Sequence, residues 1–124
     1  MVDALIASLD DVPRFDADGL VAAVHSQWPS MQWSPASGEI PELGAGEFTI
    51  EVDAQWVTVE FLPGRTGLGV EGHDDLASEV VAWLTGHVAM PEGQVVILNW
   101  GDDVVPLREN MPVEELRRLH TYGR

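Results

Sequence analysis

The chain has 124 residues, the size of one ordinary domain, and 45% of them are hydrophobic, which excludes an intrinsically disordered chain. Twenty-one acidic residues stand against six arginines and no lysine, so the formal net charge is −15. This charge excludes a general nucleic-acid-binding protein and argues against docking on an anionic membrane, because both surfaces attract clustered basic residues. There are no cysteines, which excludes disulfides, catalytic thiols and cysteine-ligated zinc. We expect one domain over residues 1–124.

The N-terminal residues are apolar at Val2, Leu5, Ile6 and Leu9. This helical spacing predicts a short N-terminal helix. Acidic residues interrupt the apolar positions and the first base is Arg14, so the segment does not have the pattern of a secretory signal. No apolar run approaches the roughly 18 residues that a membrane span requires. These features predict a cytoplasmic protein that does not interact with a membrane.

The next part of the chain predicts a helix followed by a loop. Apolar periodicity indicates a helix over residues 17–27, with Asp16 or Asp18 as its N-terminal cap. Residues 31–33 alternate briefly and could add a strand. Residues 34–46 contain two prolines and three glycines, which predicts a loop.

The clearest strand signal lies in the middle of the chain. Residues 48–52 alternate between apolar and polar side chains, and residues 56–62 are rich in β-branched and aromatic ones. Residues 53–55 lie between them, so the pattern predicts an antiparallel hairpin. After a Pro-Gly turn, residues 66–70 predict a third strand of a meander, weakened by its glycines.

The C-terminal part predicts a helix, two strands and a last helix. Asp74 is expected to cap the first of these helices. Residues 95–98 are continuously apolar, which predicts a buried central strand. Residues 104–107 predict a strand. Because Pro106 cannot donate a ladder hydrogen bond, we expect this strand at an edge of the sheet or the proline near the end of its strand. Pro112 is expected to occupy the first position of the last helix.

Hairpins dominate this order of elements, and strands and helices do not alternate regularly. The order predicts an α+β fold, a single domain with an antiparallel sheet of about five strands and helices packed mainly on one face. Indole rings are large and apolar, so we expect at least three of the five tryptophans to be largely buried. The five are Trp28, Trp33, Trp56, Trp83 and Trp100.

One group of residues could bind a metal. Glu71, His73, Asp74 and Asp75 offer oxygen and imidazole ligands to a divalent cation. The alternative interpretation is a helix N-terminus, where acidic side chains cap backbone amides and meet the positive end of the helix dipole. The group has neither the spacing of an EF-hand loop nor paired histidines at helical spacing.

Other catalytic patterns are absent or out of context. No serine lies in a Gly-x-Ser-x-Gly motif. Gly67, Gly69 and Gly72 match G-x-G-x-x-G, but they precede a helix whose first turn carries two aspartates, which would repel a pyrophosphate. The Asp102-Asp103 pair is typical of a hairpin turn. We predict no catalytic residue, no metal ion and no cofactor.

Acidic residues are dense on both sides of the predicted hairpin. Eight acids and no base lie between Arg14 and Arg65, and seven more acids without a base follow from Glu71 to Asp103. Such a surface serves either simple solubility or the fast binding of a basic protein. On the predicted hairpin, Glu51 and Asp53 would share one face of their strand, because side chains alternate along a strand.

In size, acidity, lack of cysteine and order of elements, the chain resembles two groups of bacterial proteins. These are the immunity proteins that neutralise toxins and the secretion chaperones of type III systems. The first resemblance implies a non-enzymatic inhibitor that binds a basic toxin domain, with carboxylates in place of the phosphates that the toxin binds. The side chains expected to bind this partner are Glu47, Glu51, Asp53, Glu60, Asp102, Asp103, Trp56 and Trp100.

Two alternatives remain open at this point. The second resemblance implies a dimeric chaperone that holds an effector segment, which needs an apolar groove and a stable homodimer. The other alternative is a metal-dependent hydrolase that uses Glu71, His73, Asp74 and Asp75.

Overall fold

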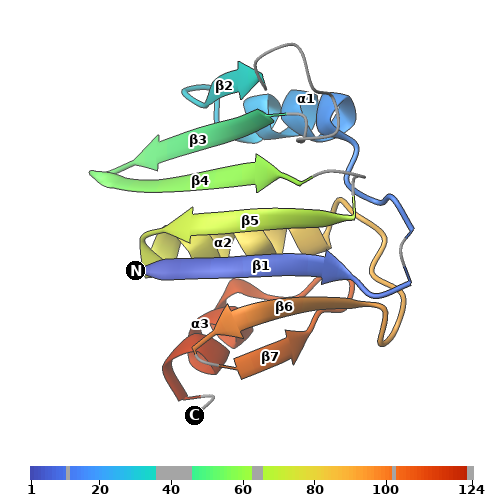
Figure 1. The fold of residues 1–124 in the computed structure, drawn as a ribbon. Coiled ribbons are helices and arrows are strands. Elements are labelled where there is room, and N and C mark those ends of the chain that lie inside the picture. Colours follow the sequence, from blue (N-terminus) through green and yellow to red (C-terminus); the bar gives the residue numbers. More distant parts are fainter. Residues whose placement is uncertain (11, 36–45, 63–65, 102, 123–124) are drawn as a thin grey trace.

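The computed structural model describes residues 1–10, 12–35, 46–62, 66–101 and 103–122, which form one antiparallel sheet of seven strands and three helices (Figure 1). The elements in chain order are β1 (Val2–Ser8), α1 (Ala17–Gln27), β2 (Gln32–Pro35), β3 (Gly46–Val52), β4 (Gln55–Phe61), β5 (Gly67–Gly72), α2 (Asp74–Thr85), β6 (Val95–Trp100), β7 (Asp103–Pro106) and α3 (Val113–Tyr122). Across the sheet the strands follow the order β2-β3-β4-β5-β1-β6-β7.

All three helices lie on the same side of this sheet (Figure 1). The end of α1 contacts α2 through the edge-to-face pair of Trp28 and Trp83, whose ring centroids are 5.5 Å apart. Helix α2 contacts α3 through Arg117, which pairs with Glu79 at 3.4 Å. The predicted α+β class and the antiparallel sheet are therefore confirmed, with seven strands in place of about five.

The main difference from the sequence prediction lies at the N-terminus. The predicted helix over residues 2–9 is wrong, because this segment is strand β1 and pairs with β5 on one side and β6 on the other. Val2 and Ile6 point into the core, whereas Leu5 lies on the opposite face. An interior strand with apolar side chains on both faces loses its alternation, so a short apolar segment can be mistaken for a helix.

Most of the other elements agree with their sequence patterns. Helix α1 has its predicted bounds, and Asp16 caps it by accepting a hydrogen bond from the Gly19 N–H at 3.3 Å. Strand β7 lies at an edge of the sheet, as Pro106 predicted. The cap of α2 was predicted one residue too late, because His73 occupies the N-cap position and makes no side-chain capping bond.

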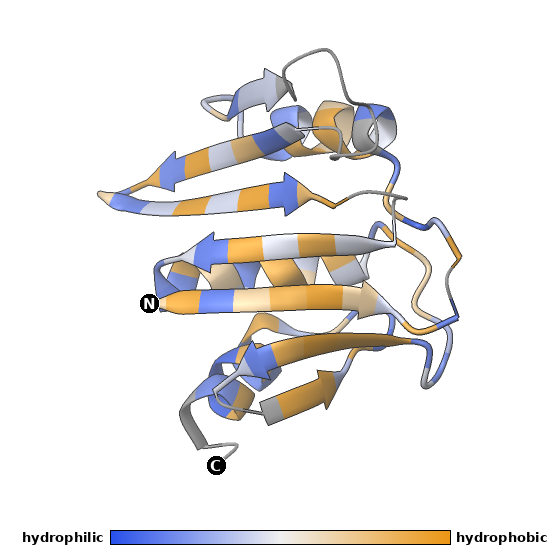
Figure 2. Cartoon of the chain, in the orientation of Figure 1, coloured by the Kyte–Doolittle hydropathy of each residue, from blue (hydrophilic) through white to orange (hydrophobic). Residues whose placement is uncertain are grey.

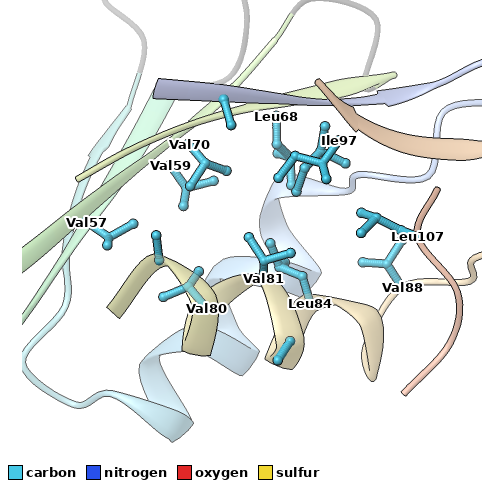
Figure 3. Close-up of a cluster of buried hydrophobic side chains, with 14 of the residues drawn as sticks. Val57, Val59, Leu68, Val70, Val80, Val81, Leu84, Val88, Ile97 and Leu107 are labelled. Carbon is cyan, nitrogen blue, oxygen red and sulfur yellow. The ribbon is translucent and has the colours of Figure 1, made fainter. Parts of the chain in front are cut away.

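The core fills the space between the sheet and the helices (Figure 3). Val59, Val70 and Ile97 of the strands face Val81 and Leu84 of α2. Each large aliphatic side chain buried in this way stabilises the fold by about 1.5–3 kcal/mol.

Trp100 reaches this core through a bulge in β6. The register between β6 and β7 shifts between Leu98 and Trp100, and Asn99 in the bulge has a φ of 63°. The bulge turns Trp100 to the helix side, where it is 0% exposed and its Nε1–H donates to the Leu116 carbonyl at 2.9 Å. The other four tryptophans are half-buried.

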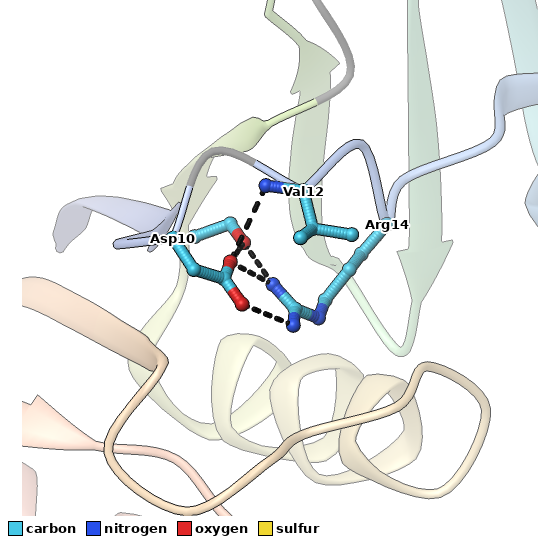
Figure 4. A network of polar contacts seen from close by, with 4 residues as sticks. Asp10, Val12 and Arg14 are labelled. Atoms are coloured by element: carbon cyan, nitrogen blue, oxygen red, sulfur yellow. Dashed lines mark hydrogen bonds and ion pairs between the residues drawn. The ribbon is translucent and has the colours of Figure 1, made fainter.

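The connection between β1 and α1 is held by a polar network (Figure 4). The Asp10 carboxylate pairs with the Arg14 guanidinium and accepts hydrogen bonds from the Ser8 hydroxyl and the Val12 N–H. The Arg14 guanidinium holds the pKa of Asp10 well below its usual range. A carboxylate whose pKa is lowered in the folded state stabilises that state at neutral pH, and the contribution is lost as the pH falls towards the lowered pKa.

The hairpin turn between β3 and β4 contains strained backbone. Val52 pairs with Gln55, so only Asp53 and Ala54 form the turn, and their φ values are 50° and 66°. Two successive positive φ angles are typical of the type I′ turn, which matches the twist of a hairpin and favours Asn-Gly. Alanine in this left-handed region costs about 1–2 kcal/mol because its Cβ crowds the backbone.

We therefore expect Ala54→Gly to raise the free energy of unfolding by about 0.5–1 kcal/mol, which is the relieved strain minus the entropy cost of glycine. Urea denaturation measures the change. Ala22→Gly is the matched control, since Ala22 is exposed in α1 and the variant should lower stability by about 1 kcal/mol. Effects of the same sign in the two variants would contradict the strained turn.

Candidate functional site: the open face of the sheet

The face of the sheet opposite the helices is uncovered by any described helix. On β3, β4, β5, β1 and β6, side chains that point to the helices are buried, so the intervening side chains lie on this open face. Pairing across all seven strands places one residue of each strand in a single row, which we call the central row. In order, the central row is Ser34, Glu47, Glu60, Gly69, Leu5, Leu98 and Val104.

One part of the open face is acidic. Glu47 and Glu60 are directly opposite each other on β3 and β4, and Asp3 and Glu71 are directly opposite each other on β1 and β5. All four side chains are exposed. Side chains directly opposite on an antiparallel pair are close enough to interact, and like charges there destabilise the sheet. Glu51, on the same face of β3, completes the group. These five residues, Asp3, Glu47, Glu51, Glu60 and Glu71, are called the acidic patch below.

The described basic groups lie elsewhere. Arg14 pairs with Asp10, and Arg108 pairs with Glu115. Arg117 of α3 pairs with Asp75 at 3.5 Å and with Glu79 at 3.4 Å. Within the described part of the chain, no ion pair involves a member of the acidic patch. The negative charge of this patch is therefore available to a cation from outside the described residues.

A shallow hollow of about 90 Å³ lies in the acidic patch. Asp3, Glu47, Glu60 and Glu71 contribute to its lining, and Gly69 contributes its bare backbone. Beside the hollow, the hydroxyls of Thr49 and Thr58 hydrogen-bond to each other across β3 and β4 at 2.9 Å. A hollow of this size and charge suits one cationic side-chain head.

The other part of the open face is apolar. Leu5 and Leu98 are half-buried, and Val104 is 59% exposed. Hydrophobic residues follow one another along most of β6 and β7, whereas polar and apolar residues alternate on β3 and β4 (Figure 2). The helices cover one face of β6, and on its open face Val96 is buried whereas Leu98 is half-buried. We call Leu5, Leu98 and Val104 the apolar patch.

The structure brings together half of the residues predicted to bind a partner. Glu47, Glu51 and Glu60 lie on the open face. Half-buried Trp56 is on the same face, opposite Glu51, and contacts His73 edge to face. Asp53 is exposed in the hairpin turn instead of on the strand face, so the predicted shared face of Glu51 and Asp53 is wrong.

Of the other predicted residues, only Trp100 has a described side chain, and it does not join this surface. Trp100 is fully buried and cannot anchor a partner at the surface. Asp102 lies outside the described residues, and so does the side chain of Asp103. The sequence pattern did not indicate Asp3, because a helix was predicted there, and Glu71 was assigned first to a possible metal site and only second to the acidic face. Only the pairing of β1 with β5 places Asp3 and Glu71 on the same surface as Glu47 and Glu60.

The four residues considered for a metal site have other contacts. The Trp56 N–H donates to Nδ1 of His73 at 3.0 Å. Asp74 pairs with the amino group of Met1 at 3.1 Å, and Asp75 pairs with Arg117. Glu71 points to the open face. Among the described residues, no three His, Cys, Asp or Glu side chains gather closely enough to hold a metal ion.

Comparisons with models of protein families, with curated proteins and with solved structures returned no match. In the described part of the chain, no helix is long and apolar enough to cross a membrane.

The opposed carboxylates predict a measurable effect on the free protein. Glu60→Gln removes one member of the Glu47–Glu60 pair and should raise Tm by about 1–2 °C at low salt. The gain should shrink as salt is added, since salt screens exposed charges within about 10 Å at 0.1 M.

Glu92→Gln is the matched control, because Glu92 is exposed in the turn before β6 and the substitution changes the net charge equally. Thermal unfolding followed by circular dichroism measures both variants. An equal rise in Tm for the two variants would show that total charge, and not the cross-strand pair, sets the effect.

Proposed function

We propose that this chain is a non-enzymatic binding protein whose open sheet face binds a basic protein. The supporting observation is the acidic patch, where carboxylates are opposed in pairs and have no ion-pair partner among the described residues. A cationic surface brought against this patch would relieve the repulsion between the carboxylates and gain charge-assisted hydrogen bonds.

The wider distribution of charge supports the same proposal. Three of the described arginines, Arg108, Arg117 and Arg118, lie in or beside α3 on the covered side of the sheet. The open face therefore carries negative charge without local compensation, which attracts a basic protein over a distance and speeds the encounter. This local excess of carboxylates without an ion-pair partner among the described residues supports an acidic docking face over acidity that serves solubility alone.

Within this class, we propose an immunity-type inhibitor of a toxin domain. An enzyme domain that acts on nucleic acid or nucleotides needs a basic active site, and opposed carboxylates on a rigid sheet can occupy that site in place of phosphates. The contacts of His73, Asp74 and Asp75 leave the alternative of a metal-dependent hydrolase without a supporting observation among the described residues.

The decisive variant is Glu60→Lys. It replaces a like-charge pair with an opposite-charge pair, so the free protein should become more stable while its binding of a basic partner weakens by about tenfold or more. The partner is first captured on the immobilised wild-type chain at low salt from cells of the source organism, and the affinity of the purified partner is then measured by calorimetry. Glu92→Lys is the control of equal charge change and should bind as the wild type does.

A growth assay tests the immunity function itself. The captured partner, expressed alone in a susceptible host, should arrest growth, and co-expression of the wild-type chain or Glu92→Lys should restore it. Glu60→Lys should restore growth poorly. A partner that is harmless alone would refute the immunity function, and equal binding by Glu60→Lys and the wild type would refute the acidic docking face.

A further inference from the structure

We propose that the element of the partner that docks here is an α-helix lying across the strands, with basic side chains on the acidic patch and an apolar side chain on the apolar patch. This inference rests on the proposed function and specifies the chemistry of the partner surface. It follows from the central row, which changes from acidic to apolar along one line.

The spacing along the central row sets the spacing on the partner. Neighbouring strands are about 4.8 Å apart, so Glu60 and Leu5, two strands apart, are separated by about 10 Å. An α-helix rises about 1.5 Å per residue and covers this distance in about seven residues, or two turns. One face of a helix can thus place an arginine over Glu60 and a leucine over Leu5 and its apolar neighbours.

Gly69 lies between the two patches and leaves the middle of the row without a side chain. The fold does not require glycine here, because an added Cβ would meet the Glu60 Cβ at 3.7 Å, an ordinary contact. Gly72 is different, since an added Cβ there would lie 2.3 Å from the Trp56 carbonyl oxygen. Glycine inside a strand weakens it and often marks a place where another chain approaches closely. Gly69 therefore shapes the surface for a partner.

A helix fits this surface better than a second copy of the chain does. Helices pack on exposed sheet faces as an additional layer, as they already do on the other side of this sheet. Two copies related by a two-fold axis through Gly69 and parallel to the strands would bury the carboxylates of one copy against the apolar patch of the other, and an axis along the central row would place carboxylate against carboxylate. Burying charge against apolar groups is costly, and a net charge of −15 on each copy adds repulsion.

Two synthetic helical peptides of identical composition test the inference. In the first peptide, two arginines and two leucines lie on the same face of the helix, and the leucines are about two turns away from the arginines. In the second, the leucines are moved to the opposite face. Fluorescence anisotropy at physiological salt should show that the first peptide binds the wild type at least about fivefold more tightly, because only its leucines reach the apolar patch.

Variants of the chain locate the contact. Val104→Ser should remove most of the difference between the peptides, whereas Val12→Ser, at a valine 44% exposed outside the sheet, should not. Gly69→Val should lower the affinity of the chain for the first peptide by about tenfold, because the valine side chain fills the space between the patches. Its Tm should not fall, because valine favours strands and the site has room for a Cβ.

The outcomes separate this inference from the proposed function. Three results would refute a docked helix. These are equal binding of the two peptides, no binding of either peptide, and no effect of Val104→Ser and Gly69→Val on binding. The acidic docking face would stand in each case if Glu60→Lys still weakened the basic protein partner. A fourth result would also refute the docked helix. If sedimentation showed a homodimer of the wild type and a monomer of Val104→Ser, a second copy of the chain would cover the apolar patch.

Discussion

The pairing of β1 on both of its edges is the interaction on which the rest of the structure depends. Without it, the chain would contain a four-stranded meander from β2 to β5 and a separate hairpin of β6 and β7. The ladders of β1 with β5 and with β6 join these parts into one sheet and close the core over α2. They also align the acidic side chains of the meander with the apolar side chains of the hairpin in the central row. The docking surface is therefore a consequence of long-range pairing.

The open face keeps features that lower the stability of the free protein. Opposed carboxylates repel each other, a glycine weakens the central part of β5, and Val104 exposes apolar surface to water. On the helix side, by contrast, Arg108 and Arg117 pair with acids and the indole of Trp100 has its hydrogen-bond partner. Most of the unfavourable local features named here therefore lie on the open face, whereas the helix side carries the pairs that stabilise the fold. Such a division is expected where one side serves the fold and the other serves binding.

Local sequence patterns predicted correctly those elements whose structure is determined by residues close together in the chain. The cap of α1 by Asp16, the hairpin of β3 and β4, and the edge position forced by Pro106 all depend on nearby residues. The pattern failed at β1, where Leu5 is apolar on the open face and hides the alternation. It also failed at Trp100, since a bulge at Asn99 turns this side chain inward, and no local pattern marks a bulge that tertiary packing selects.

The candidate site was harder to predict than the fold because it depends on register. Glu47 and Glu60 could be placed on one surface from the hairpin alone, since both strands and their turn are local. Asp3 is separated from Glu71 by most of the chain, and only the ladder of β1 and β5 makes them neighbours. A shift of one residue in that ladder would move Asp3 and Leu5 into the core and Ile6 to the open face. The strong burial preference of Val2 and Ile6 excludes this shift, so the core residues of β1 determine which of its side chains complete the docking surface.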